Sequence, residues 1–246
     1  MDSSIHLVIP MAGKGSRFTE GGFEIPKPLI EIYGKPMFFW AIQSIRKFVD
    51  LASLRIVVLE EHVINFNIDR VILELFPEAL IIALPEVTKG SVITCIKGVE
   101  DIKDHKPVVF NDCDHYFIST EFYKFCKLTQ YASSDGALLT FKSNSSNYSY
   151  IKRDSQGGVI GTVEKKVVSD DAICGCYYFT NKNIFCFAAE AYISICADKE
   201  YFMSGVYDYL IHTGLVKTIP TDFHIPCGTP SELDKAKKSE LYRCLL

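Results

Sequence analysis

The stretch IPMAGKGSRFTEGGFEIPKPLIEIYGKP, residues 9–36, decides the fold class of this chain. It continues from the short apolar run IHLVIP, residues 5–10, which predicts a buried strand. In open parallel sheets, ligands bind at the carboxyl ends of the strands, where such loops emerge. Glycines let backbone N–H groups approach an anion closely, and Lys14, Arg17 and Lys27 add positive charge. The stretch therefore predicts a phosphate-binding loop.

The rest of the N-terminal half predicts a parallel sheet, because short apolar runs alternate with helical patterns. We expect strands at 5–10, 54–60, 79–85 and 106–112, and helices at 36–49, 62–76 and 90–100. All four strand runs have an apolar centre, and we expect them to be buried on both faces, as parallel strands are. Strand–helix–strand repetition with short connections favours right-handed crossovers between parallel strands.

After about residue 135 the pattern changes, and strands follow one another in quick succession. We expect strands at 135–142, 148–154, 158–166, 172–180 and 215–222, and helices at 181–197, 203–213 and from Ser231 onward. The segment DSQGG, residues 154–158, predicts a tight hairpin turn. Because no linker or repeat interrupts the chain, we predict one mixed α/β domain over residues 1–246.

The composition limits the partners and the location of the protein. The net charge of −4 argues against a nucleic-acid partner, because such partners need a basic surface. No apolar run is long enough to span a membrane, and the N-terminus lacks the features of a signal peptide, so we expect a cytoplasmic protein. The nine cysteines are an odd number, and we expect reduced, mostly buried thiols. A homo-oligomer is compatible with the sequence.

The predicted phosphate loop matches neither of two well-known phosphate-binding motifs. The dinucleotide fingerprint G-x-G-x-x-G fails because Phe18 stands at its third glycine position, and the Walker motif G-x-x-x-x-G-K-[ST] is absent. The chain has instead G-x-G-x-R at 13–17, followed by P-K-P-L at 26–29 and G-K-P at 34–36. This order resembles the opening of the sugar-phosphate nucleotidylyltransferases, the family that includes glucose-1-phosphate thymidylyl-, uridylyl- and cytidylyltransferases.

The resemblance implies a single-domain, Rossmann-like mixed α/β fold related to that of GT-A glycosyltransferases, with a mainly parallel sheet and an antiparallel substrate-side part. Residues 1–134 would form a nucleotide-binding half and residues 135–246 a substrate-side half. The implied enzyme couples a nucleoside triphosphate to a phosphorylated small molecule, with Mg²⁺ as cofactor and pyrophosphate as product. The implied nucleotide-binding residues are Met11, Ala12, Gly13, Lys14, Gly15, Ser16 and Gly90, and the implied catalytic residues are Arg17 and Lys27.

Two aspartates follow the fourth predicted strand, in NDCDHYF at residues 111–117. Residues two apart on an extended segment face the same side, so Asp112 and Asp114 can reach one cation. Hard oxygen ligands beside a phosphate loop predict Mg²⁺, and the resemblance aligns Asp114 with the family's acidic metal ligand. Two other readings are an acid that caps a turn or helix, and zinc bound with Cys113 and His115, although no second cluster completes four zinc ligands.

The segment GTVEKKVVSDDAICGCYYF, residues 161–179, resembles the family's E-K segment followed by a glycine before an aromatic strand. The resemblance implies that Glu164 holds sugar hydroxyls and that Lys165 holds the acceptor phosphate, with Lys166 as the alternate if the register slips by one. Gly175 would let the substrate ring approach the backbone closely. A solvated, charged strand end is the competing reading.

Two departures from the family pattern concern the nucleotide base and the second metal ligand. A glutamine that reads the base is absent after the third strand, where Leu84 and Glu86 stand. An acid usually precedes the G-T pair near the C-terminus, but this chain has Pro226 and Cys227 there. Asp222 would replace that acid only if the backbone bends. Fixation of the metal from two sides is therefore in question.

The resemblance implies a Mg²⁺-dependent nucleotidylyltransferase, with a sugar 1-phosphate as the first candidate acceptor, in nucleotide-sugar or surface-polysaccharide biosynthesis. Non-sugar phosphates, such as phosphocholine-like molecules, remain open as acceptors. A GT-A-type glycosyltransferase would use Asp112 and Asp114 to bind a ready-made nucleotide sugar, but it would not need the G-x-G-x-R and P-K-P-L segments. A catalytically impaired, nucleotide-binding regulator is the third hypothesis, and the missing C-terminal acid favours it.

Overall fold

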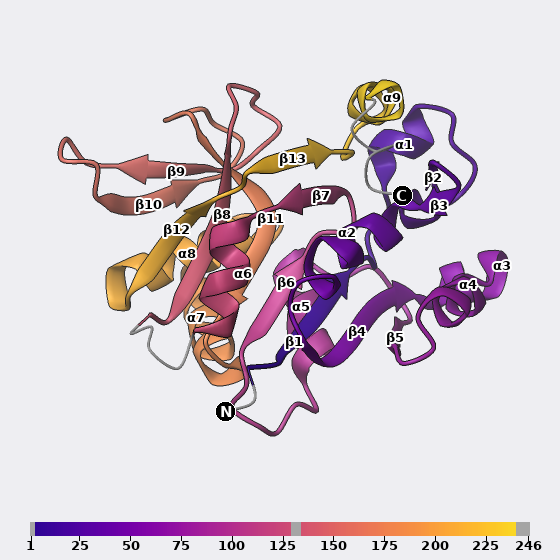
Figure 1. Cartoon of the computed structure of the whole chain (residues 1–246), viewed down its shortest axis with the longest axis horizontal. Helices are drawn as coiled ribbons and strands as arrows, with labels where there is room; N and C mark the ends of the chain where they lie inside the picture. The colour runs from indigo at the N-terminus through magenta and orange to yellow at the C-terminus, as the bar shows by residue number, and fades with distance from the viewer. Residues whose placement is uncertain (1–2, 129–133, 240–246) are drawn as a thin grey trace.

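The structure, a computed structural model, describes residues 3–128 and 134–239, and in it a central sheet lies between two layers of helices (Figure 1). Among these residues the main sheet has nine strands, in the order β10-β9-β11-β6-β1-β4-β5, with β8 paired to β11 and β12 to β8. These strands are β1 Ile5–Pro10, β4 Leu51–Leu59, β5 Leu80–Leu84, β6 Val108–Asn111, β8 Gly136–Lys142, β9 Tyr150–Arg153, β10 Val159–Val163, β11 Asp171–Phe179 and β12 Val216–Pro220.

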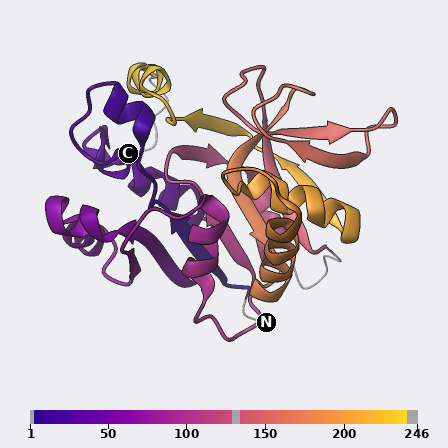
Figure 2. The ribbon, with the colours of Figure 1, turned by 180° about the vertical axis from the view of Figure 1, so that it is seen from behind.

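The helices cover both faces of this sheet. Helices α2, α4 and α6 pack on the face seen in Figure 1, and α5, α7 and α8 pack on the face seen in Figure 2. The helices are α1 Ser16–Glu20, α2 Met37–Arg46, α3 Glu60–Phe66, α4 Ile68–Leu75, α5 Ser91–Val99, α6 Thr120–Lys127, α7 Lys182–Ile195, α8 Met203–Thr213 and α9 Pro230–Lys238. No described helix has the length and apolar composition that crossing a membrane requires.

The direction of the strands changes at β11, and this separates a parallel part of the sheet from a mixed part. Strand β1 runs parallel to β4 and β6, and β4 runs parallel to β5. Strand β11 runs antiparallel to β6 and to β8, and β9 and β10 form an antiparallel hairpin. The predicted mixed α/β fold, with its antiparallel substrate-side part, is confirmed.

The central parallel strands are buried on both faces, as predicted, but the edge strand is not. In β1, Ile5, Leu7 and Ile9 face one helix layer, whereas Val8 faces the other. Strand β5 pairs only with β4, and its Leu80 is 48% exposed. The prediction of burial on both faces is therefore wrong for residues 79–85, because an edge strand lacks a second neighbour.

Two further differences from the predicted elements concern one helix and one small sheet. The single helix predicted at 62–76 is broken into α3 and α4 at Asn67, which has φ 50 and ψ 37, a left-handed conformation that asparagine tolerates. We also did not predict a small sheet, in which β7 His115–Ile118 pairs antiparallel with β13 Phe223–Pro226.

The described cysteines are all free and mostly buried, as expected, and Cys244 lies outside the described residues.

A separate apolar cluster fastens the loop after β1 to the C-terminal segment. It joins α1 and the hairpin β2 Glu31–Ile32 and β3 Lys35–Pro36 to β7, β13 and α9, and both views show α1 beside α9 (Figures 1 and 2). Its buried members are Phe18, Ile30, Ile32, Met37, Trp40, Tyr116, Ile225, Cys227, Leu233 and Ala236. This cluster, not the main core, fixes the phosphate loop against residues 225–233.

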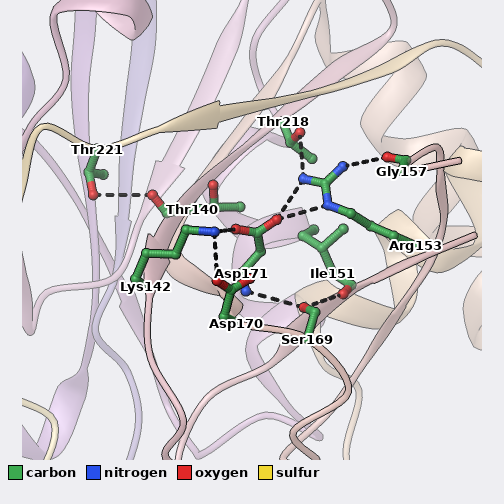
Figure 3. A network of polar contacts seen from close by, with 10 residues as sticks. All are labelled: Thr140, Lys142, Ile151, Arg153, Gly157, Ser169, Asp170, Asp171, Thr218 and Thr221. Carbon is green, nitrogen blue, oxygen red and sulfur yellow. Dashed lines mark hydrogen bonds and ion pairs between the residues drawn. The ribbon is translucent and has the colours of Figure 1, made fainter. Parts of the chain in front are cut away.

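A polar network ties the mixed part of the sheet together at the start of β11 (Figure 3). Asp171 accepts a hydrogen bond from Arg153 Nε (2.8 Å) and another from Lys142 Nζ (2.8 Å). Arg153 also donates to Thr218 Oγ1 on β12 (3.4 Å), so one carboxylate links β8, β9, β11 and β12. Burial raises the pKa of Asp171, but the two cations outweigh burial, and the pKa lies below its ordinary value.

We expect Asp171→Asn to lower the free energy of unfolding by about 1 kcal/mol at pH 7, because it removes a partly buried acceptor of two charged donors that solvent partly screens. The pKa is lowered in the folded state, so this contribution is complete above the unfolded pKa of about 3.9 and is lost as pH falls through the folded pKa. Urea denaturation at neutral and acidic pH measures it.

Asp170→Asn is the matched control for this prediction. Asp170 also pairs with Lys142 (2.9 Å), but its side chain is 72% exposed, whereas that of Asp171 is 14% exposed. Exposed ion pairs contribute little to stability. Equal losses from the two substitutions, or a loss for Asp171→Asn that persists unchanged at acidic pH, would contradict the assignment.

Candidate active site

The glycine-rich loop leaves the carboxyl end of β1, as predicted, and turns at Gly15 into α1. The Met11 amide donates to Val57 O (2.9 Å), so the pairing of β1 with β4 extends one residue beyond the strand. Gly15 has φ 62, and a Cβ at this position would lie 3.1 Å from the Cβ of Lys27. The glycine thus lets the loop pack directly against Lys27.

Two adjoining cavities lie at the carboxyl ends of the parallel strands. The loop cavity, of about 430 Å³, is lined by the loop after β1 and by the segment that leads into α5. The sheet cavity, of about 320 Å³, is lined by residues at the ends of β6, β10 and β11, with Glu200 and Glu232. Arg17, Lys27 and Asp114 line both cavities, so the two share a charged boundary.

The loop cavity brings together most of the residues predicted to bind a nucleotide. Its lining includes Ala12, Gly13, Lys14, Gly15, Ser16 and Gly90. Met11 is the exception, because the alternation that buries Leu7 and Ile9 on one face of β1 continues past the end of the strand. The Met11 side chain therefore lies in the same core cluster as these two residues.

Gly90 stands where the loop before α5 meets the segment before α8. It has φ 113, and a Cβ would lie 2.4 Å from Tyr201 O. The Tyr201 amide donates to Lys89 O (3.0 Å), and the Val92 amide donates to Tyr201 O (3.3 Å). These contacts bring Glu200 to the boundary of both cavities. Glycine is required here because no side chain fits between the two backbones.

A partly buried ion pair occupies the boundary between the cavities. Lys27 Nζ lies 2.9 Å from Asp114 Oδ2. Burial raises the pKa of Asp114, but the charge of Lys27 outweighs burial and holds that pKa well below its usual range. Burial likewise lowers the pKa of Lys27, yet Asp114 and its neighbours raise it above its ordinary value. Both groups are therefore charged at neutral pH.

Asp112 has a different protonation behaviour from Asp114, although the two are only two residues apart. Burial, and then the charge of Asp114, raise the pKa of Asp112 to about 7, while Lys27 opposes the rise. Its carboxylate makes no side-chain hydrogen bond with the described residues, and its amide donates to Gly175 O (2.9 Å). Asp112 is thus a buried acid whose ionised form a bound cation would stabilise.

The donor atoms around Asp112 fit a divalent cation. One ligand atom each from Asp112, Asp114 and His115 lies within 4.8 Å of the others. Gly175 has φ 77, and a Cβ there would lie 2.8 Å from Asp112 Oδ2, so its absence leaves space beside the carboxylate. The ammonium of Lys27 already sits against Asp114 as a cation. Carboxylate oxygens beside a phosphate loop suit Mg²⁺.

The competing readings of the acidic pair are not supported by this geometry. A strand, β7, follows Asp114, so neither aspartate caps a helix, although residues 113–114 do form a turn between β6 and β7. The Cys113 side chain lies in the apolar core and is not among the donor atoms that converge beside the aspartates. Among residues 3–128 and 134–239 the Asp112–Asp114–His115 group is the one cluster of this kind, so four zinc ligands do not assemble.

The predicted substrate-side residues all line the sheet cavity. Glu164 accepts hydrogen bonds from Ser149 Oγ and from Ser204 Oγ (2.7 Å). Lys165 Nζ lies 3.6 Å from Glu164 Oε1 and 4.5 Å from the centre of the Phe202 ring. Lys165 lines the cavity although its side chain is 46% exposed, whereas Lys166 is exposed and does not line it.

Neither candidate near the C-terminus supplies the missing acid of the family pattern. Cys227 is buried, and its amide donates to Asp114 O (2.8 Å). Asp222 accepts a hydrogen bond from the amide of Thr120 (2.7 Å), at the start of α6, and it does not line either cavity. Asp222 therefore does not replace the acid, because its carboxylate is engaged at the start of another helix.

Glu232 lines the sheet cavity, although the sequence analysis did not identify it. Its carboxylate accepts a hydrogen bond from Tyr148 Oη. A Cβ on Gly228 would lie 2.9 Å from Asp114 Oδ2 and 3.4 Å from Glu232 Oε2, so the two carboxylates flank this glycine. In the sequence, Glu232 follows Thr229 by three residues, which is a capping-box pattern at the start of a helix. This pattern explains the glutamate by helix capping alone, so it gives no signal that Glu232 lines a cavity.

The sequence profile of the nucleotidyl transferase family matches residues 7–233, which is most of the chain and includes both cavities. The chain belongs to the nucleotidyl transferase family. The resemblance drawn from the G-x-G-x-R and P-K-P-L segments is thereby confirmed. A search of curated protein sequences finds no significant match.

Solved structures with the same fold include three nucleotidyltransferases. A nucleoside-diphosphate-sugar pyrophosphorylase from Vibrio cholerae has a TM-score of 0.79 at 24% identity, covering 95% of this chain and 100% of its own. A putative glucose-1-phosphate thymidylyltransferase from Bacillus anthracis, in complex with a sucrose, has a TM-score of 0.78 at 16% identity, covering 95% and 94%. The inositol-1-phosphate CTP transferase of T. maritima has 0.74 at 14%, covering 97% and 98%.

We expect the Asp112 carboxyl of the metal-free protein to titrate with a midpoint near 7, measured by ¹³C NMR of labelled aspartate carboxyls. Lys27→Met removes a cation that lowers this pKa, so the midpoint should rise. Asp114→Asn removes a like charge, so the midpoint should fall. Shifts of the same sign in the two variants would contradict the charge arrangement described above.

Proposed function

We propose that this protein is a Mg²⁺-dependent nucleotidylyltransferase that joins a nucleoside triphosphate to a phosphorylated acceptor, with a sugar 1-phosphate as the first candidate, and releases pyrophosphate. The observation that carries the proposal is the pair of cavities that share Arg17, Lys27 and Asp114. The triphosphate would lie in the loop cavity and the acceptor in the sheet cavity. The two substrates would then meet at the boundary of the cavities, beside Arg17, Lys27 and Asp114.

The proposed reaction is a displacement at the α-phosphorus. An oxygen of the acceptor phosphate forms a new bond to the α-phosphorus, and the bond from that phosphorus to the bridging oxygen of pyrophosphate breaks. The electron pair of the broken bond leaves with pyrophosphate. Because the attacking oxygen is already anionic, no general base is needed, and catalysis rests on alignment and charge neutralisation.

The chain's own residues would divide these tasks. Arg17 can donate two parallel N–H groups to the departing pyrophosphate. Lys27 would leave Asp114 and bind the transferring phosphoryl group. Lys165 would bind the acceptor phosphate, and Glu164 would accept hydrogen bonds from acceptor hydroxyls. Mg²⁺ held by Asp112 and Asp114 would neutralise charge on the triphosphate oxygens.

We expect Arg17→Ala and Asp114→Ala each to lower pyrophosphate release about 100-fold or more, the usual effect of removing one positioned group from a charged transition state. Arg70→Ala and Asp170→Ala are matched controls, because neither side chain lines a cavity. Circular dichroism checks that each variant folds. Near-full activity in either site variant would overturn the role of that residue.

A panel of the four nucleoside triphosphates against sugar 1-phosphates and non-sugar phosphates, read out as pyrophosphate, tests the function itself. Release that depends on both substrates is the expected result. A GT-A-type glycosyltransferase, which the Asp112–Asp114 spacing also suits, would instead hydrolyse or transfer from a nucleotide sugar. An impaired homologue, suggested by Cys227 in place of an acid, would bind nucleotide without turnover. We place the activity in the cytoplasm, in the synthesis of nucleotide sugars or surface polysaccharides.

A further inference from the structure

The imidazole of His115 lies beside the carboxylates of Asp112 and Asp114 and forms a three-residue cluster with them. Its Nε2 atom lies 3.5 Å from Asp114 Oδ1, and its side chain is only 10% exposed. One donor atom from each of the three residues lies within 4.8 Å of the other two. No hydrogen bond to Nε2 occurs among the described residues, so this nitrogen, on a side chain that is mostly but not fully buried, faces the two carboxylates without a hydrogen-bond partner.

His224 holds the other side of this imidazole ring. His115 Nδ1 and His224 Nε2 share a hydrogen bond of 2.8 Å, and the two rings are stacked with their centres 5.0 Å apart. The antiparallel pairing of β7 with β13 keeps the two residues together. Histidines that bind metals almost always have their second ring nitrogen fixed by a hydrogen bond in this way.

The space in front of the imidazole is kept open by Gly175. A Cβ at this position would lie 2.9 Å from His115 Nε2 and 2.8 Å from Asp112 Oδ2. The nitrogen and the oxygen therefore converge on one point that any other residue would fill. A histidine that served only to pack β7 against β13 would not need this opening.

We propose that His115 Nε2 is a third protein ligand of the cation, beside Asp112 and Asp114. The set of one nitrogen and two oxygen donors would bind Mn²⁺ or Co²⁺ more tightly than Mg²⁺, because imidazole suits transition metals whereas Mg²⁺ prefers oxygen. With Nε2 on the cation, the ring proton lies on Nδ1 and is donated to His224. The inference rests on the proposed function only in that it assigns a cation to the two carboxylates.

Pulsed electron paramagnetic resonance with Mn²⁺ alone tests this ligand directly, without nucleotide or turnover. Wild-type protein should show modulation from a directly bound ¹⁴N nucleus. His115→Asn should lose the modulation and weaken Mn²⁺ binding about 10-fold or more, with little change for Mg²⁺. The asparagine amide keeps a donor near the Nδ1 position, so the contact with His224 is retained.

Two further variants make the result specific. His115→Gln places an amide oxygen near the position of Nε2, so it should keep Mg²⁺ binding and lose the nitrogen signal. His212→Gln, on the exposed end of α8, should leave the spectrum unchanged. Calorimetric titration with Mn²⁺ and Mg²⁺ gives the affinities, and circular dichroism checks the fold.

Absence of nitrogen modulation in the wild type, or its persistence in a folded His115 variant, would overturn the proposal. If His115→Asn does not fold, the wild-type spectrum and His115→Gln still decide. Nitrogen modulation in a protein that releases no pyrophosphate would support the ligand and overturn the proposed function. Pyrophosphate release without nitrogen modulation would support the function and overturn the ligand.

Discussion

The ion pair between Lys27 and Asp114 is the interaction on which the arrangement of the site depends. It joins the turn that follows the phosphate loop to the end of β6, although the two residues are 87 positions apart. Because both groups are partly buried, removing one partner would leave a charge that is poorly compensated by solvent. The pair therefore keeps the two cavities in contact and keeps Asp114 ionised.

The charged residues around this pair differ between the two cavities. Bases outnumber acids in the lining of the loop cavity, and acids outnumber bases in that of the sheet cavity. On the loop side, Lys14 and Arg17 accompany backbone N–H groups, which suits an entering polyanion. The sheet cavity is richer in acids than in bases. Its acids are Asp112, Asp114, Glu164, Glu200 and Glu232, and its bases are Arg17, Lys27 and Lys165. In the proposed function, the acceptor phosphate would therefore lie near Lys165 and the cation on the aspartates.

Missing side chains are as important to the site as the charged ones. Because Gly15 has no side chain, Lys27 packs directly against the loop, and because Gly90 has none, the backbone of Tyr201 packs against it. Gly175 leaves space beside Asp112. Gly228 does the same between Asp114 and Glu232. Gly90, Gly175 and Gly228 each lie where segments that are distant in sequence meet. A Cβ at any of them would press on its neighbour, so small backbone gaps define where ligands can lie.

The sequence by itself determined the parallel core, the phosphate loop and the acidic pair, because these depend on local order: a buried apolar run, the glycines after it, and aspartates two residues apart. The G-x-G-x-R and P-K-P-L segments were enough to indicate the family. Most strand and helix positions followed the same local patterns, but Asn67 breaks a predicted helix, and the small β7–β13 sheet and helix α6 were not predicted.

Only the tertiary structure decided which polar residues from distant segments share the site. The pairing of β7 with β13 sets His224 against His115, and the start of α9 turns Glu232 toward Asp114. These contacts join residues about a hundred positions apart, and no periodicity or motif spacing records them. The same holds for the protonation of Asp112, since burial and the charges of Asp114 and Lys27 exist only once the chain has folded.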